Sequence, residues 1–294
     1  MSGRAAPDVS VLIPVRNGGA LLGAQLEALS RQSFEGSWEI VVVDNGSTDA
    51  TPDVLAEWSR RLPQLRVVRA AGPPNASVAR NAAAKAAVAP LLAFCDADDV
   101  VDPGWLGALV DAAGRADLVA GRLDVNGLND ETAIFWRSFA MPAAGTTPAF
   151  GYLPYAVSAN MAVTRTAFTE VGGFDAKIPG PGSEEIDFCW RVQEAGHAFT
   201  HAADAVIGYR FRTDLRAFVR QQLRYGQGEA ALYARHRPRM RRDPITDAIR
   251  AAWFALSRCH HVVRGPARRG RYLGYLAYRV GRVAGGVRAR VAYW

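Results

Sequence analysis

The sequence predicts an α/β fold with a mostly parallel central sheet covered by helices, followed by a basic helical C-terminal appendage. Two observations carry this prediction. Short apolar runs alternate with segments of helical periodicity from the N-terminus onward, which is the pattern of a parallel sheet with helices on both faces. Beyond residue 212 the chain becomes rich in arginine and keeps a helical pattern, as expected for a part of different character.

Periodicity and punctuation place the individual elements. The predicted strands cover 9–14, 38–43, 65–68, 91–95 and 117–121, and the predicted helices cover 18–31, 51–61, 76–88, 103–114 and 184–195. Residues 125–158 are less regular, with Pro, Gly and Thr clustered at 142–151. We expect them to form an excursion over one face of the sheet. Gly and Pro at 265–270 predict breaks in the C-terminal helical region.

The composition indicates a folded protein with no disulfide framework. The chain has 294 residues, nearly half of them apolar, which allows a sizeable core. Its three cysteines lack any close pairing, so we expect neither disulfides nor a cysteine-based zinc site. Residues 1–10 hold no signal-peptide core, and no stretch reaches the about 20 apolar residues of a spanning helix. These features predict a reduced, cytoplasmic protein that is soluble or peripheral to a membrane.

The formal net charge of +7 conceals two parts of opposite sign. Residues 1–204 carry 15 basic and 24 acidic side chains, whereas residues 205–294 carry 20 basic and 4 acidic side chains. The front of the chain is therefore acidic and the C-terminal part strongly basic, which predicts different partners for the two.

Polar residues follow three predicted strands at the end where open parallel sheets bind ligands. The segments are Pro14-Val-Arg-Asn17, Asp44-Asn-Gly-Ser47 and Asp96-Ala-Asp-Asp99. A single segment of this kind is ordinarily a turn or a helix cap. Three in sequence order at one edge of a sheet indicate a ligand site.

The acidic run at 96–99 is the most informative of the three. Three carboxylates in four residues repel one another, and Asp96 and Asp98 could present oxygens to one Mg²⁺ or Mn²⁺ ion. Such an ion would neutralise a diphosphate leaving group as its bond to a sugar breaks. The alternative is a solvated acidic loop in which Asp99 or Asp102 caps the next helix.

In their order and spacing, these segments resemble the family 2 glycosyltransferases. The resemblance covers roughly residues 8–212 and lies in Val-Leu-Ile-Pro-Val-Arg-Asn, Ile-Val-Val-Val-Asp-Asn-Gly-Ser-Thr-Asp, Ala-Arg-Asn, Phe-Cys-Asp-Ala-Asp-Asp, and Gly-Gly-Phe-Asp followed by Glu-Glu-Ile-Asp. It implies a GT-A-type nucleotide-binding fold and an inverting mechanism that uses a nucleotide diphosphate sugar and a divalent metal held by an Asp-x-Asp motif. It also implies a domain of residues 1–212, with a donor half at about 8–121 and an acceptor or catalytic half at about 122–212, before an Arg-rich region at 213–294.

The resemblance assigns four positions to the nucleotide. Pro14 and Asn17 match the start of the family's nucleotide pocket. Asp44 matches the residue that hydrogen-bonds the base, and Ser47 belongs to the same loop.

Four further positions match the diphosphate and metal end of the family's site. Arg80 and Asn81 match an Arg-Asn pair near the base and diphosphate. Asp96 matches the residue that faces the ribose and the metal, and Asp98 matches the metal ligand. Arg80 also has a physical case of its own, because a guanidinium suits a phosphate or a neighbouring carboxylate.

A second acidic cluster at 183–187 supplies a candidate base. An inverting transfer needs one carboxylate to take the proton of the acceptor hydroxyl. The family usually has Glu-Asp here, with Asp as base, whereas this sequence has Glu-Glu, which implies Glu185 as the base. Asp187 is the alternative base, and a purely structural reading is a helix start enriched in acids.

Tyr209 marks a second departure from the family, because many relatives place a metal-binding histidine there. A neutral phenol is a poor ligand for Mg²⁺ or Mn²⁺. The two departures keep open a catalytically inactive protein that binds sugar nucleotides or membranes. A sugar-nucleotide nucleotidyltransferase is a third possibility, although Pro14-Val-Arg-Asn-Gly-Gly19 lacks the spacing of its phosphate loop.

The basic tail predicts an anionic membrane surface as a partner. From Arg264 onward tyrosine and leucine alternate with arginine, a pattern typical of a surface anchor, with a solvated helix or an oligomer contact as the alternative. No nucleic-acid module accompanies the charge, so nucleic acid is not expected. Gln221-x-x-Arg224-Tyr225 is similar to the Gln-x-x-Arg-Trp motif of processive polysaccharide synthases, but the spanning helices of those enzymes are missing. We therefore expect transfer of a single sugar to a hydroxyl acceptor, such as a glycan or lipid-linked glycan in polysaccharide or cell-envelope synthesis.

Overall fold

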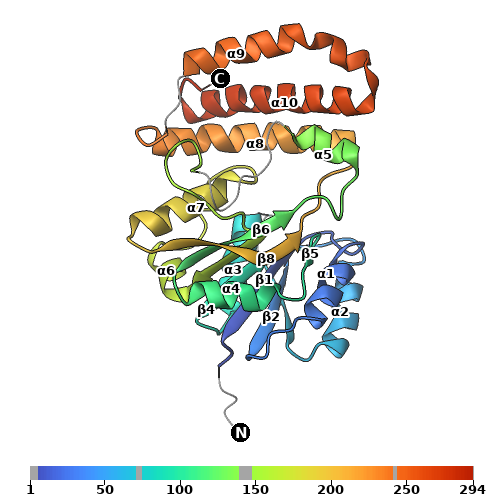
Figure 1. The fold of residues 1–294 in the computed structure, drawn as a ribbon, viewed down its shortest axis with the longest axis vertical. Coiled ribbons are helices and arrows are strands. Elements are labelled where there is room, and N and C mark those ends of the chain that lie inside the picture. The colour runs from blue at the N-terminus through green and yellow to red at the C-terminus, as the bar shows by residue number, and fades with distance from the viewer. Residues whose placement is uncertain (1–5, 71–74, 139–147, 241–243, 294) are drawn as a thin grey trace.

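A computed structural model of the chain describes residues 6–70, 75–138, 148–240 and 244–293. Its centre is one eight-stranded sheet with the strand order β3-β2-β1-β4-β7-β6-β8-β5. Most helices of the first 200 residues pack against this sheet, and the C-terminal helices lie together at the end of the molecule opposite the N-terminus (Figure 1). The mostly parallel sheet covered by helices, and the helical C-terminal part, are confirmed.

Four neighbouring strands form the parallel half of the sheet. They are β1 (Val9–Val15), β2 (Trp38–Asp44), β3 (Leu65–Arg69) and β4 (Leu91–Cys95). Val15 pairs with Asp44 in the register of β1 and β2. The carboxyl ends of these strands therefore meet at one edge, so the polar segments that follow them come together.

The other half of the sheet mixes parallel and antiparallel pairs. It contains β5 (Val100–Val101), β6 (Leu118–Asp124), β7 (Asn160–Thr164) and β8 (Phe199–Gly208). β7 runs antiparallel to both β4 and β6, β6 pairs parallel with β8, and β5 closes the edge antiparallel to β8. β8 thereby carries the chain back toward the edge where β4 ends.

Helices cover both faces of the sheet because alternate strand residues point to opposite sides. Val11 and Ile13 pack in one apolar cluster with the first, second and fourth helices, whereas Leu12 packs in another with the third, sixth and seventh. The helices are α1 (Leu22–Ser30), α2 (Thr51–Arg61), α3 (Ala76–Ala86), α4 (Trp105–Ala113), α5 (Glu131–Arg137), α6 (Arg165–Glu170) and α7 (Ser183–Glu194).

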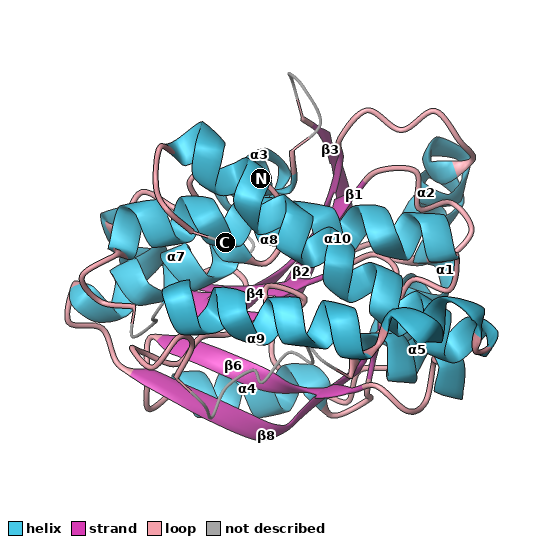
Figure 2. Cartoon of the chain, turned by 90° about the horizontal axis from the view of Figure 1, so that it is seen from above, coloured by secondary structure: helices cyan, strands magenta, loops and turns pink. Residues whose placement is uncertain are grey.

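The C-terminal part consists of α8 (Leu215–His236), α9 (Pro244–Ser257), a 3₁₀ turn η1 (Cys259–Val263) and α10 (Gly265–Ala289). Figure 2 shows these helices from above, in front of the strands. α5 joins this layer, since the ring of Trp136 lies 5.3 Å from that of Phe218 on α8. Among the described residues, no helix is long and apolar enough to cross a membrane.

The sequence places most elements within a few residues of their observed bounds, and two expectations need comment. The predicted break at 265–270 is confirmed only at its first residues, because η1 ends at Val263 and α10 begins at Gly265 with a proline in its first turn, after which the helix continues through 270. The close packing of Trp136 on α10 explains the glycine at position 270, because a β-carbon there would lie 2.2 Å from the indole nitrogen. Of the predicted excursion at 125–158, residues 139–147 lie outside the described residues, and the described part contains α5, which packs on the C-terminal helices. The three cysteines are free, as expected.

Candidate active site

A cleft of about 760 Å³ opens at the carboxyl ends of β1, β2 and β4. One wall comes from the sheet edge, the loop 176–181 forms part of another, and α8 lies across the cleft from the sheet edge. Its size suits a small molecule such as a nucleotide or nucleotide sugar. The predicted site residues that line it are Pro14, Arg80, Asp96 and Asp98.

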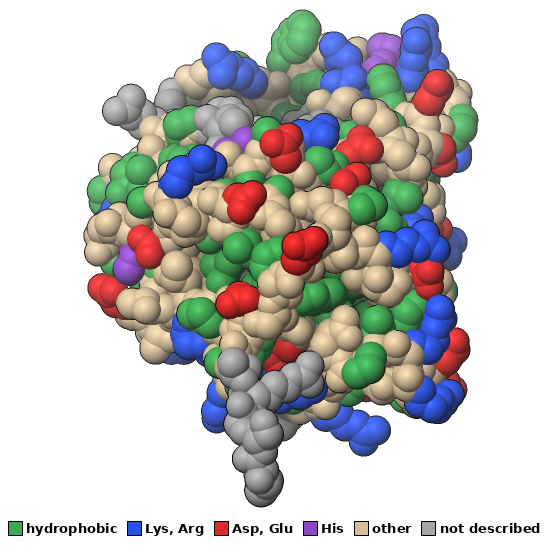
Figure 3. Space-filling model, turned by 60° about the horizontal axis from the view of Figure 1, so that its bottom comes forward, with side chains coloured by type: hydrophobic (Ala, Val, Ile, Leu, Met, Phe, Trp, Pro, Cys, Tyr) green, Lys and Arg blue, Asp and Glu red, His purple; other side chains and the backbone are tan. Residues whose placement is uncertain are grey.

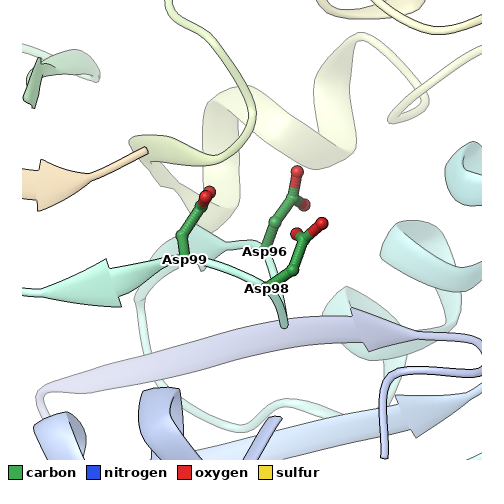
Figure 4. A group of neighbouring side chains, drawn as sticks. All are labelled: Asp96, Asp98 and Asp99. Carbon is green, nitrogen blue, oxygen red and sulfur yellow. The ribbon is translucent and has the colours of Figure 1, made fainter. Parts of the chain in front are cut away.

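The acidic run forms a group of three converging carboxylates just after β4. One oxygen each of Asp96, Asp98 and Asp99 lies within 4.8 Å of the others. Figure 4 shows the three side chains rising from the loop between β4 and β5. Asp96 and Asp98 line the cleft, whereas Asp99 is buried and accepts a 2.8 Å hydrogen bond from the backbone N–H of Arg210.

The protonation behaviour of these carboxyls fits a cation site. Burial and the charge of Asp96 raise the pKa of Asp98, and burial with the charges of Asp98 and Asp96 raises that of Asp99 well above its usual range. Oδ2 of Asp99 is buried and has no hydrogen-bond partner among the described residues. A divalent cation between the carboxylates would offset their mutual repulsion and supply a partner for the buried oxygen of Asp99. The residues present therefore fit Mg²⁺ or Mn²⁺, with Asp96 and Asp98 as the accessible ligands.

Arg80 connects the acidic run to the second acidic cluster. Its guanidinium donates to Oδ1 of Asp96 at 3.0 Å and to Oε1 of Glu184 at 3.2 Å. Arg80 and Glu184 are almost fully buried, and burial raises the pKa of Glu184 in spite of this partner. Glu184 lines the cleft. The two ion pairs hold the start of α7 close to the end of β4, although Arg80 and Glu184 are 104 positions apart in the sequence.

Glu185 lies beside Glu184 at the start of α7 and has different partners. Its Oε2 accepts hydrogen bonds from the backbone N–H and the hydroxyl of Ser158, at 2.8 and 2.7 Å. Burial and the charge of Glu184 raise the pKa of Glu185 to about 8. Oε1 makes no hydrogen bond with the described residues and is not among their fully buried atoms. This oxygen can therefore accept a hydrogen bond, or a proton, from a hydroxyl group of a bound molecule.

Asp187 is fully buried in an ion-pair cluster away from the cleft lining. Its carboxylate lies 2.8 Å from Arg191, 3.1 Å from Arg235 and 2.9 Å from His236. These partners lower the pKa of Asp187 although burial raises it. Because Arg235 and His236 are on α8, the cluster attaches α8 to α7.

The remaining predicted nucleotide-binding residues, at positions 17, 44, 47 and 81, are not among those that line the cleft. Asn17 and Ser47 contact each other: the backbone N–H of Asn17 donates to the Ser47 hydroxyl at 2.9 Å. Asp44 is buried at the end of β2 and accepts from the backbone N–H of Ser47 at 2.9 Å. Asn81 does not line the cleft; its amide binds the backbone N–H and C=O of Phe174 at 2.9 and 2.8 Å.

Several cleft residues were missed in the sequence. The most numerous are basic side chains from the loop 176–181, the segment after β8 and α8: Lys177, Arg210, Arg212, Arg220 and Arg224. Gln221, Arg224 and Tyr225 line the cleft together, so the motif that contains them gave a signal that the absence of spanning helices obscured. Tyr209 also lines the cleft, and burial raises its pKa well above the usual value, which keeps the phenol neutral.

An open sheet with a polar cleft at the carboxyl ends of its parallel strands defines the molecule as an α/β ligand-binding protein. The chain belongs to the family described as Glycosyl transferase family 2, which it matches over residues 10–172.

Two relatives show how far the similarity extends. The chain is 28% identical to the pre-mycofactocin glycosyltransferase of Mycobacterium tuberculosis over 264 residues, which cover 87% of this chain and 54% of that protein. It is 27% identical to the glycosyltransferase AglE of Haloferax volcanii over 239 residues, which cover 80% of this chain and 77% of AglE. The chain thus spans about half the length of the first of these relatives.

Solved structures share the fold at low sequence identity. The mannosyltransferase PcManGT of Pyrobaculum calidifontis, in complex with GDP-Man and Mn²⁺, matches with a TM-score of 0.67 and 18% identity over 95% of this chain and 87% of that one. Residues 1–349 of Staphylococcus aureus TarS, in complex with UDP-GlcNAc, match with a TM-score of 0.55 and 17% identity over 97% and 92% of the two chains. The fold is therefore of the GT-A type.

Proposed function

We propose that the protein is an inverting, metal-dependent glycosyltransferase that moves a single sugar from a nucleotide diphosphate sugar to a hydroxyl acceptor. The observation that carries the proposal is the cleft, which is lined by a cation-type pair, Asp96 and Asp98, and by Glu184, the residue next to the buried carboxylate Glu185. An inverting transfer needs both elements: one end stabilises the leaving diphosphate and the other takes a proton.

The donor would lie along the edge of the parallel strands, in the half of the domain at about 8–121. Pro14 and the loop of Asp44 and Ser47 would hold the nucleoside, as the resemblance implies. PcManGT with GDP-Man and TarS with UDP-GlcNAc support a donor of this class on this fold. Arg80 would bind the diphosphate or orient Asp96, to which it donates at 3.0 Å.

A divalent cation, when bound, would stabilise the negative charge that develops on the diphosphate as the sugar leaves. Asp98 and Asp96 would hold it, and the Mn²⁺ of PcManGT supports this choice of ion. Arg210 and Arg212 approach from the end of β8 and would complete the charge balance, since the guanidinium of Arg212 lies 3.7 Å from Asp98. The neutral phenol of Tyr209 would bound the cleft without acting as a ligand.

Glu185 would act as the base in the acceptor half at about 122–212. As the acceptor oxygen bonds to the anomeric carbon, the bond from that carbon to the diphosphate breaks on the opposite face. The hydroxyl proton passes to Oε1 of Glu185, the oxygen that Ser158 leaves free. Glu185 is favoured over Asp187 because Arg191, Arg235 and His236 hold both carboxylate oxygens of Asp187, whereas Oε1 of Glu185 has no hydrogen-bond partner among the described residues. Neither carboxylate lines the cleft, but Glu185 adjoins Glu184, which does.

The acceptor would be a glycan or lipid-linked glycan of polysaccharide or cell-envelope synthesis, and the enzyme would work on the cytoplasmic face of a membrane. The strong positive charge of residues 205–294 supports attraction to an anionic surface. The C-terminal region of residues 213–294 would supply that contact.

Release of nucleoside diphosphate from a panel of nucleotide sugars, with and without Mn²⁺, tests the proposed function. We expect turnover to require the metal and to fall by at least about 100-fold in Asp98→Ala, because electrostatic stabilisation of the leaving group is lost. Glu185→Gln should abolish transfer and spare donor binding. Asp111→Ala removes an exposed carboxylate on α4 and should change neither. Metal-independent turnover in Asp98→Ala would overturn the metal assignment, and full activity in Glu185→Gln would move the base to another residue.

The alternative function is donor binding without catalysis. The observation that favours it is the pair of family departures, Glu185 at the base position and Tyr209 in the cleft wall. Tight donor binding with no transfer to any of a broad range of acceptors would support that alternative.

A further inference from the structure

α9 exposes a continuous apolar stripe. Four of its large apolar side chains are between 65% and 77% exposed and recur at intervals of three or four residues, which places them on one face of the helix. Val263 of η1 extends the stripe and is 84% exposed. This docking face consists of Ile245, Ile249, Trp253, Leu256 and Val263.

The opposite side of α9 is held against α10. The ring of Phe254 lies 4.1 Å from that of Tyr275, and the Tyr272 hydroxyl donates to the backbone carbonyl of Ala255 at 2.9 Å. Arg282 of α10 reaches Asp247 of α9 at 3.3 Å. These contacts fix the rotation of α9, so the docking face points away from the rest of the protein.

The tyrosines that the sequence pattern assigned to a membrane anchor therefore have another role. Tyr272 is buried and Tyr275 packs on α9, so they form the support beneath the docking face rather than the surface itself. The apolar contact would instead be made by α9, with Trp253 near its centre.

Uncompensated positive charge surrounds the docking face. Residues 244–294 contain ten arginines and one acidic residue, Asp247. Four of these arginines are exposed and have no ion pair among the described residues: Arg250 on α9, Arg264 between η1 and α10, and Arg268 and Arg269 in the first turns of α10. By contrast, the face at the other end of the molecule mixes acidic and basic side chains (Figure 3).

We infer that α9 and η1 lie flat on an anionic lipid bilayer, with the docking face in the boundary between headgroups and acyl chains and the arginines on the lipid phosphates. An apolar stripe bordered by arginine, on a helix that cannot span a bilayer, is the pattern of an interfacial helix. Tryptophan is enriched at this depth because its ring is apolar and its N–H is polar.

Charge decides between this occupant and two others. A second copy would bring the same arginines to the contact, and the two basic surfaces would repel each other. A nucleic acid would satisfy the arginines but leave the exposed apolar side chains without a matching surface. An anionic bilayer satisfies both features together. The inference rests on the proposed membrane association and names the surface that produces it.

Flotation of the full chain with lipid vesicles tests the inference. The chain should float with vesicles of phosphatidylcholine containing phosphatidylglycerol and stay behind with vesicles of phosphatidylcholine alone. Trp253→Ser and Leu256→Ser should each lower the partition coefficient by about tenfold or more, because apolar area no longer leaves water. Val88→Ser removes a similarly exposed apolar side chain outside the C-terminal region and should have no effect.

The arginines are tested separately. Replacing Arg264, Arg268 and Arg269 with glutamine should weaken binding to the anionic vesicles by about fivefold per arginine and reduce its salt dependence. Circular dichroism should show an unchanged melting temperature for all these variants, since the altered side chains are exposed.

Two results would overturn the inference: vesicle binding that is unchanged in Trp253→Ser and Leu256→Ser, or a dimer in lipid-free sedimentation that dissociates in those variants. Nucleoside diphosphate release, measured on the same variants without vesicles, separates the inference from the proposed function. If the variants lose vesicle binding and release nucleoside diphosphate normally, the docking face is supported. If the unchanged protein binds vesicles as expected but releases no nucleoside diphosphate, this inference still holds and the proposed activity is contradicted.

Discussion

The hydroxyl and the backbone N–H of Ser158 both donate to the same oxygen of Glu185, Oε2, at 2.7 and 2.8 Å. Both bonds favour the ionised carboxylate, whereas burial and the charge of Glu184 favour the neutral acid. The balance raises the pKa of Glu185 to about 8. A carboxyl with such a pKa is a stronger base than an ordinary glutamate and changes protonation near physiological pH.

The first prediction concerns the pH dependence of activity. Only the carboxylate form of Glu185 can accept the hydroxyl proton, so kcat/KM should rise with pH and reach half its limit near pH 8. The free energy of unfolding should decrease over the same pH range. Because the pKa of Glu185 is raised in the folded protein, the folded state binds this proton more tightly than the unfolded chain, and this stabilising contribution is lost as pH rises from about 4.5 toward 8. A rising limb centred near pH 4 to 5 would contradict Glu185 as the base.

The second prediction concerns Ser158 as the residue that positions and tunes this base. Ser158→Ala removes one of two hydrogen bonds to the carboxylate and should move the midpoint of kcat/KM upward by about one pH unit. The KM for the donor should not change. Ser158→Thr keeps the hydroxyl and should restore the original profile. A loss of activity in Ser158→Ala that is equal at every pH would indicate a structural role instead.

Those parts of the site that depend on local sequence could be predicted. β1 and β4 are short apolar runs with polar residues directly after them, so their ends and their side of the sheet follow from the pattern. Asp96 and Asp98 are two residues apart in one loop, so the short distance between their carboxylates depends on local sequence alone. The predicted cation-type cluster was therefore recognisable before any tertiary contact was known.

Contacts across long stretches of chain could not be predicted. The hydrogen bond from Arg80 to Glu184 joins residues 104 positions apart, and that from Arg210 to Asp99 spans 111. Each depends on how β8 and α7 return to the end of β4. The sequence showed which charges exist, but the fold alone decides which of them meet and which line the cleft.

The C-terminal helices illustrate the same limit for apolar faces. The tyrosines and leucines after Arg264 correctly indicated an amphipathic helix. Periodicity shows that a helix has an apolar face, but it does not show which neighbour covers that face. Here α9 covers the tyrosines of α10, and α9 itself presents the exposed stripe.

The third prediction tests the two roles of Arg80. Arg80→Met leaves the buried carboxylate of Glu184 without its cation, so the free energy of unfolding should fall by about 3 kcal/mol. Adding Glu184→Gln should recover part of this loss, because the buried charge is removed. Donor binding by calorimetry should stay impaired in both variants, since the guanidinium that we propose to bind the diphosphate is still missing.

Arg66 provides the matched control, because it also pairs with a glutamate, Glu39 at 2.8 Å, but is 47% exposed. Arg66→Met should cost less than about 1 kcal/mol and leave donor binding intact. Normal donor binding in Arg80→Met would show that this arginine only joins α3 to α7.

The fourth prediction concerns the close contact of α8 and α10, which keeps α8 over the cleft. A β-carbon on Gly281 would lie 2.1 Å from the backbone oxygen of Leu223, and one on Gly226 would lie 2.1 Å from that of Tyr278. Backbone atoms cannot move aside as a flexible side chain can, so Gly281→Ala must separate the helices. We expect the free energy of unfolding to fall by about 2 kcal/mol and the KM for the donor to rise, because Arg220 and Arg224 move with α8.

Gly107 separates this contact from the general effect of adding a methyl group to a helix. It lies within α4, and no atom would meet a β-carbon there within 4 Å. Gly107→Ala should therefore stabilise the protein by up to about 1 kcal/mol, since alanine favours the helix. The two substitutions are chemically identical, so opposite signs in thermal unfolding isolate the contact between the helices. Equal stabilisation by both would mean that α8 and α10 pack less closely, and that α8 is held over the cleft by Asp187 and its partners alone.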